Sequence, residues 1–185
     1  MGAAHSLKEE NHQITKGIYK TKEIIKQLEE LTEKRINNIL FDSDKDDWNK
    51  NTSVFDERIM NKEHIIIIIE DEDGNKFGGY VNEKIDKVDE CIYDSKSFVF
   101  SLESKGRMKG MMKFDIKLPE YAFILFNQSD IWLFEIGLGD IAVFKENYKT
   151  NSFCNQYSFE YEGITNALCG KYHFTPKRII VIEMK

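Results

Sequence analysis

The chain of 185 residues has only two prolines, only three cysteines and no long apolar run. The shortage of proline excludes long proline-rich linkers, and 13 phenylalanines favour an ordered chain. The cysteines are odd in number, widely spaced and without a C-x-x-C pair, which argues against a disulfide framework or a zinc site. We therefore expect a reducing, cytoplasmic compartment. Because no secretory leader follows Met1 and no stretch of about 18 apolar residues occurs, we expect a chain that is neither secreted nor membrane-spanning.

Basic residues are fewer than acidic residues in this chain. Lys and Arg together number 26 against 32 Asp and Glu, which gives a net charge of −6. An acidic chain repels phosphate backbones, and no long basic run occurs, so we do not expect nucleic acid as a partner. An apolar content of 41% suits one globular domain with a modest extension.

Short motifs of common catalytic and nucleotide-binding sites, such as G-x-S-x-G, H-E-x-x-H and G-x-x-x-x-G-K-[ST], are missing. The histidines lack metal-ligand spacing; they are His5, His12, His64 and His173. The stretch "DSDKDDW" (42–48) resembles a calcium loop, but Asp47 stands where such a loop needs glycine and Ser53 where it needs glutamate. "GLGD" (137–140) lacks a following Lys-Ser or Lys-Thr helix, which favours a tight turn between strands. We predict no catalytic set, no metal site and no cofactor.

The first residues, "MGAAHSLK", match the pattern for N-myristoylation, with Gly2 as the acyl acceptor. The alternative is an artificial leader, since the segment resembles nothing else in the chain. A single acyl chain gives only weak, reversible membrane binding, about 10⁴ M⁻¹. Acylation of Gly2 would place the protein peripherally on a membrane.

Residues 7–40 show the spacing of an amphipathic helix. Leu7, Ile14, Thr21 and Leu28 fall seven residues apart, and Ile18 and Ile25 belong to a second row offset by four. Two interpretations remain open: a short coiled coil that forms a homodimer, or a helix that lies on the globular domain. We divide the chain into a helical segment, 1–35, and a second domain, 36–185.

Short strands are expected from residue 36 onward. Five consecutive isoleucines, 65–69, predict a strand buried on both faces, and "KFGGYV" (76–81) predicts its hairpin partner across an Asp73-Gly74 turn. Further strands are expected at 97–102, 111–116, 122–127, 131–137, 140–145 and 178–184. A short helix is expected at 52–58, capped by Thr52 or Ser53. This pattern predicts a mainly β fold, an antiparallel sandwich or barrel.

Several motifs taken together resemble the TLDc domain. They are "NNILFDSDKDDWNKNTSVFDERI", "GNKFGGYV", "DSKSFVFSL", "GLGDIAVF", "TNSFCNQYSFEYEG" and "NALCGKYHFTPKRIIVIEM", in this order across residues 36–185. The form is most similar to the TLDc proteins of amoebae and other protists, which often carry a helical segment in front.

This resemblance implies a sandwich of two antiparallel sheets with flanking helices. It also implies a link to protection against oxidative stress, and some family members bind the vacuolar proton-pumping ATPase. No enzymatic active site is established for the family. The positions that match the family pattern are interpreted as structural: Gly78, Gly79, Gly139, Asp140 and Glu183. The glycines would serve turns or close backbone approach, and Glu183 would hold a charge near the sandwich edge.

Three functional hypotheses follow. The first is a non-catalytic protein-interaction module, not an enzyme, with the vacuolar ATPase as the named partner. The second is a redox-active protein that uses Cys154 or Cys169, since Lys171 could lower the pKa of the nearby Cys169. The third is a membrane-tethered adaptor that is N-myristoylated at Gly2.

Overall fold

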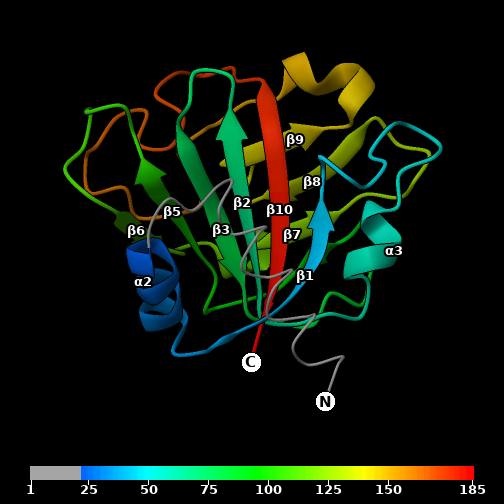
Figure 1. The fold of residues 1–185 in the computed structure, drawn as a ribbon, viewed down its shortest axis with the longest axis horizontal. Helices are drawn as coiled ribbons and strands as arrows, with labels where there is room; N and C mark the ends of the chain where they lie inside the picture. Colours follow the sequence, from blue (N-terminus) through cyan, green and yellow to red (C-terminus); the bar gives the residue numbers. More distant parts are fainter. Residues whose placement is uncertain (1–21) are drawn as a thin grey trace.

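A computed structural model describes residues 22–185, which form two antiparallel β-sheets packed face to face (Figure 1). The larger sheet contains, in spatial order, β1 (Ile36–Asp42), β10 (Pro176–Met184), β2 (Ile65–Asp71), β3 (Lys76–Val81), β5 (Phe98–Glu103) and β6 (Met112–Asp115). The smaller sheet contains β4 (Cys91–Ile92), β7 (Phe123–Leu125), β8 (Trp132–Ile136) and β9 (Ile141–Phe144). The predicted mainly β, two-sheet antiparallel fold is confirmed.

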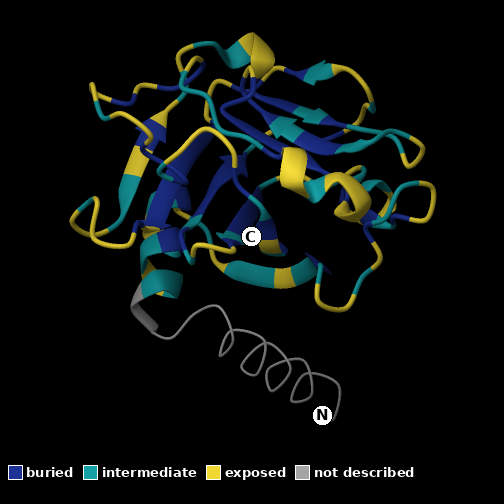
Figure 2. Cartoon of the chain, turned by 90° about the horizontal axis from the view of Figure 1, so that it is seen from above, coloured by how far each residue is buried: buried dark blue, intermediate teal, exposed yellow. Residues whose placement is uncertain are grey.

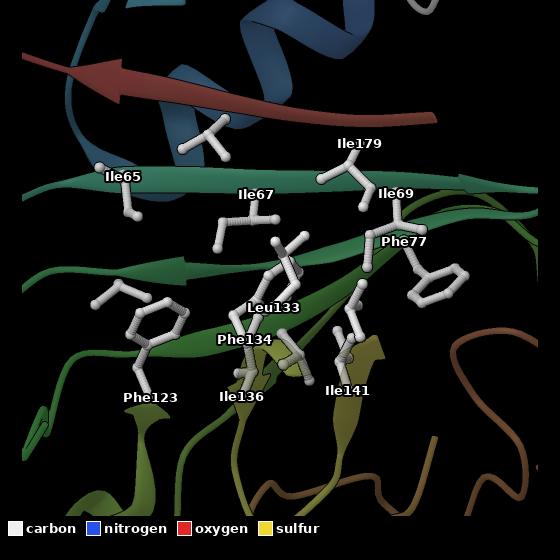
Figure 3. Close-up of a cluster of buried hydrophobic side chains, with 14 of the residues drawn as sticks. Ile65, Ile67, Ile69, Phe77, Phe123, Leu133, Phe134, Ile136, Ile141 and Ile179 are labelled. Atoms are coloured by element: carbon white, nitrogen blue, oxygen red, sulfur yellow. The ribbon is translucent and has the colours of Figure 1, made fainter. Parts of the chain in front are cut away.

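The isoleucine run forms the inner strand β2 and is buried on both faces, as its composition predicts. Ile65, Ile67 and Ile69 point into the core between the sheets, where they meet side chains of the smaller sheet (Figure 3). Ile66 and Ile68 face the opposite side of the larger sheet and are also fully buried. Each buried isoleucine contributes roughly 2 kcal/mol of transfer free energy, so this one strand is a major source of stability.

The outer face of the larger sheet is covered in part by α2 (Lys22–Thr32). Leu28 is fully buried against this face, and Ile24 and Leu31 pack beside it. Over these residues the helix therefore lies on the globular domain, the second of the two interpretations given above. The first part of the predicted helix lies outside the described residues, and its dimerisation stays a prediction.

The predicted helix over 7–40 is wrong at its end, because α2 stops at Thr32 and residues 36–40 belong to β1. Glu33 adopts a positive φ of 55°, which breaks the helix. β1 then pairs with β10 along its length. Local spacing favoured a helix, but the hydrogen bonds to a strand from the far end of the chain decide the conformation.

The other predicted elements are found with small shifts in their bounds, whereas β4 was not predicted. The second helix, α3 (Phe55–Ile59), begins three residues later than predicted, and its N-cap is Val54, so the predicted cap at Thr52 or Ser53 is wrong. The Ser53 hydroxyl still accepts a hydrogen bond from the Phe55 N–H. Two 3₁₀ turns, η1 (Pro119–Tyr121) and η2 (Glu146–Asn151), flank the smaller sheet. Figure 2 shows buried residues along both layers of strands and exposed residues mainly in the connecting loops.

The paired glycines of β3 serve close approach. A Cβ on Gly78 would lie 1.9 Å from the backbone oxygen of Ile67, and a Cβ on Gly79 would lie 2.8 Å from Cδ1 of Ile136 in the smaller sheet. The register between β2 and β3 runs without interruption through both residues. A glycine within a strand indicates either a bulge or the close approach of another chain segment, and at Gly78 and Gly79 the structure shows close approach.

Candidate functional site

The "GLGD" segment forms the tight turn between β8 and β9, as predicted. Gly137 and Gly139 adopt positive φ angles of 67° and 72°. At Gly139 a Cβ would also lie 2.7 Å from the ring of Phe153. Glycine is therefore required at residue 139 both for its backbone angle and for space.

Asp140 closes this turn and is fully buried. Its carboxylate accepts hydrogen bonds from the N–H groups of Tyr157 (3.0 Å) and Ser158 (2.9 Å) and from the hydroxyl of Tyr161 (2.8 Å). Burial raises the pKa of Asp140 above its usual range, and these donors oppose the rise. Asp140 thus ties the chain around residues 157–161 to the β8–β9 turn.

Four exposed side chains lie on neighbouring segments at this end of the smaller sheet, and we call them the tyrosine–leucine row: Tyr93, Tyr121, Leu138 and Tyr157. Tyr157 is 61% exposed and Leu138 is 43% exposed. Backbone contacts place the segments side by side. The Gly137 N–H donates to the carbonyl oxygen of Ala122 (3.2 Å), and the Leu138 N–H donates to the Ser158 hydroxyl (2.8 Å).

Tyr93, the first member of the tyrosine–leucine row, directly follows β4. The N–H of Asp94 donates to the carbonyl oxygen of Pro119 (3.0 Å), the first residue of η1. Tyr93 is thereby placed beside the segment that carries Tyr121. Four segments that are separate in the sequence but neighbours in the fold therefore each carry an exposed tyrosine or leucine side chain.

A second cluster contains Cys154 and Cys169, which together line one cavity of about 160 Å³. The other lining residues are Asn155, Gln156, Asn166, Ala167, Leu168, Lys171 and Tyr172. The chain doubles back here. The N–H of Cys154 donates to the carbonyl oxygen of Tyr172 (2.8 Å), and Phe153 forms a bridge with His173.

The pKa values of the two thiols are shifted in opposite directions. Burial raises the pKa of Cys154 well above its ordinary value. A hydrogen bond between the two thiols lowers the pKa of Cys169, and burial opposes this effect. The sulfur of Cys169 also lies 2.8 Å from the carbonyl oxygen of Lys171, to which its S–H donates. The cavity therefore holds a buried thiol next to a thiol that ionises more easily.

The family model of the TLDc domain matches residues 12–179. The chain belongs to the TLDc domain family. It is the family of oxidation-resistance proteins, as the resemblance in sequence indicated. The match includes both cysteines of the cavity and the paired glycines of β3, and it begins ahead of the boundary predicted at residue 36. No curated protein matches the chain with significant similarity.

Glu183 of this TLDc domain lies near the end of β10, beyond the matched region. Its carboxylate accepts hydrogen bonds from the side-chain amides of Asn37 (2.7 Å) and Asn38 (3.4 Å) and pairs with Lys62 (3.3 Å). Burial acts to raise the pKa of Glu183, but these partners outweigh it and hold the pKa below its usual range. Glu183 therefore fastens the start of β1 to the inner strand β10.

Other residues singled out in the sequence are not brought together. Cys91 lies on β4, where burial raises the pKa of its thiol. Within the described part of this TLDc domain, His, Cys, Asp and Glu side chains form no group of three that could hold a metal ion. None of the helices within residues 22–185 is long and apolar enough to cross a membrane. Gly2 lies outside the described residues, and its acylation stays a prediction.

Sequence reasoning missed Lys145, which is 1% exposed at the end of β9. Its ammonium donates hydrogen bonds to the carbonyl oxygens of Asn127 (2.6 Å), Gln128 (2.8 Å) and Asp130 (2.8 Å). It thereby fixes the loop between β7 and β8. The sequence offers no signal for this role, since a single lysine after a strand is usually solvated. The tyrosine–leucine row was also missed, because its members come from four separate loops.

Proposed function

We propose that this TLDc domain is a protein-interaction module in protection against oxidative stress and has no catalytic centre of its own. The observation that carries the proposal is the tyrosine–leucine row. Tyrosine supplies a large, fairly rigid contact area together with a polar tip, and it is enriched among the residues that dominate binding energy at protein interfaces. The row is therefore suited to contact with a folded partner.

Support for the row comes from the rigid structure beneath it. Asp140 is hydrogen-bonded to the segment that carries Tyr157, and the two glycines of the turn permit the conformation that presents Leu138. A surface held in place before binding loses little conformational entropy when the partner docks. Such a surface favours recognition of a preformed partner.

The named candidate partner is the vacuolar proton-pumping ATPase. The candidate rests on the family resemblance, because some TLDc proteins bind this enzyme. An adaptor of this kind would need only a docking surface, which agrees with the lack of recognisable catalytic motifs in the sequence.

The test is affinity capture from native lysate with three forms of the full chain. The first is the wild type, and the second combines Tyr121→Ser, Leu138→Ser and Tyr157→Ser. The third is the matched control Tyr148→Ser, which removes a tyrosine that is 37% exposed on η2, outside the row. We expect wild type and control to recover the same partner, with vacuolar ATPase subunits as the candidates. The triple variant should reduce recovery by at least about tenfold.

Equal recovery by all three proteins would count against the row as the binding surface. Recovery of no partner above background by the wild type would count against the module itself. Circular dichroism and thermal melts of the triple variant must match those of the wild type, so that a loss of binding is not a loss of fold.

A further inference from the structure

We infer that Cys154 and Cys169 form a dithiol site that hydrogen peroxide converts into an intrachain disulfide. This inference goes beyond the proposed interaction function, because it assigns a covalent modification to a different part of the molecule. Three observations carry it: the two cysteines line one cavity, the backbone around them is paired, and the third cysteine lies elsewhere.

The fold brings the two sulfurs together by an antiparallel return of the chain. Residues 152–154 pair with residues 172–174, through the Cys154 N–H to Tyr172 bond and the Phe174 N–H to Ser152 bond (2.9 Å). Cys169 lies in the turns just before this pairing and is 3% exposed. Both residues therefore lie on hydrogen-bonded backbone and line the same cavity, which places their side chains near each other.

The cavity gives a small oxidant access. Its volume of about 160 Å³ exceeds what one water molecule needs, and hydrogen peroxide is only slightly larger than water. Polar side chains of the lining, such as Asn155, Gln156 and Asn166, suit a polar molecule.

The chemistry proceeds in two balanced steps. The thiolate of Cys169 attacks one oxygen of hydrogen peroxide, so that an S–O bond forms and the O–O bond breaks. The leaving hydroxide takes up a proton and becomes water, which leaves a sulfenic acid on Cys169. Cys154 then attacks this sulfur, the S–S bond forms, and the S–O bond breaks with release of a second water. The dithiol is oxidised by two electrons and the peroxide is reduced to two waters.

The order of attack follows from the surroundings of each sulfur. Hydrogen bonding with Cys154 lowers the pKa of Cys169, which favours its thiolate as the attacking group. Lys171 carries an ammonium group, which forms an ion pair with Asp73. Cys154 is the resolving thiol, because its raised pKa keeps it protonated until the sulfenic acid offers a reactive sulfur.

The experiment uses the full reduced chain, treated with equimolar hydrogen peroxide and then with N-ethylmaleimide. Trypsin releases both cysteines in one fragment, residues 150–171, because no Lys or Arg lies between Lys149 and Lys171. Cleavage after Glu160 and Glu162 then separates the cysteines. We expect the two halves to stay joined until a reductant is added, and Cys91 to take up N-ethylmaleimide.

Variants separate the roles of the thiols. Cys154→Ser should accumulate a sulfenic acid on Cys169 that dimedone captures. Cys169→Ser should slow the peroxide-dependent loss of thiol in fragment 150–171 by at least about tenfold. Cys91→Ser should behave as the wild type. In wild-type protein, two separate halves that both carry N-ethylmaleimide would overturn the inference, as would disulfides that mainly involve Cys91; neither outcome depends on how a variant folds.

Discussion

At the scale of single residues, two buried charges organise loops of this TLDc domain. Asp140 collects donors from residues 157–161, and Lys145 donates to three carbonyl oxygens of the loop before β8. A buried charge is tolerated only when hydrogen bonds replace its water, and both side chains meet that condition. Asp140 could be named from the family pattern, whereas its partners could not. The role of Lys145 could not be predicted from the sequence, because its partners are backbone carbonyl groups, which every residue has.

Measuring stability as a function of pH tests whether burial raises the pKa of Asp140. Burial raises its pKa in the folded protein above the ordinary value of 3.8. The stability that this group contributes is therefore fully present below about pH 4 and is lost as the pH rises through the raised pKa. Asp140→Asn cannot titrate. We expect the unfolding free energy of the wild type, minus that of the variant, to fall as the pH rises through this window.

Urea unfolding of both proteins between about pH 4 and pH 7 measures this difference. Taking the difference removes the contributions of other groups, such as Glu183 and Asp42, whose pKa values are lowered. A difference that stays constant over the window would show that the Asp140 carboxylate has an ordinary pKa.

At the scale of elements, the sequence predicted a strand correctly where the residue types that favour a strand are also the residues that the fold buries. The run Ile65–Ile69 could be read as an inner strand, since β-branched residues buried on both faces suit no other element of that length. β1 was misassigned because its pairing with β10 is not a local property. β4 was missed because two residues, Cys91 and Ile92, carry no usable periodicity.

Gly78 allows a test at this scale, because a side chain there would meet backbone and not a movable side chain. A Cβ at Gly78 would lie 1.9 Å from the oxygen of Ile67, so β2 and β3 would have to separate. We expect Gly78→Ala to lower the unfolding free energy by about 3 kcal/mol or more. The matched control is Gly106→Ala, where a Cβ meets nothing within 4 Å and the positive φ of 82° is the only cost.

The control should lose only about 1 kcal/mol. Chemical denaturation of both variants gives the comparison. Equal losses at the two positions would mean that the strands can absorb a methyl group, and the close approach of β2 and β3 would not be the reason for the glycine.

At the scale of the whole molecule, both candidate sites depend on how the fold brings together segments that are distant in the sequence, so the sequence alone could not reveal them. The strands and the sandwich follow from alternating composition, and the family follows from ordered motifs. The two candidate sites do not follow from the sequence, because the residues of each site come from several separate loops. Cys154 and Cys169 meet only through the pairing of residues 152–154 with 172–174. The tyrosine–leucine row needs both the order of the smaller sheet and the shape of the β8–β9 turn.

We propose that this TLDc domain docks onto its partner through the tyrosine–leucine row. The most direct measurement is photo-crosslinking in cells, with benzoylphenylalanine placed singly at residue 138, 157 or 148. We expect covalent adducts with one partner protein from residues 138 and 157, which lie in the row, and none from residue 148 on η2. Adducts from residue 148 alone, or from none of the three positions, would contradict it.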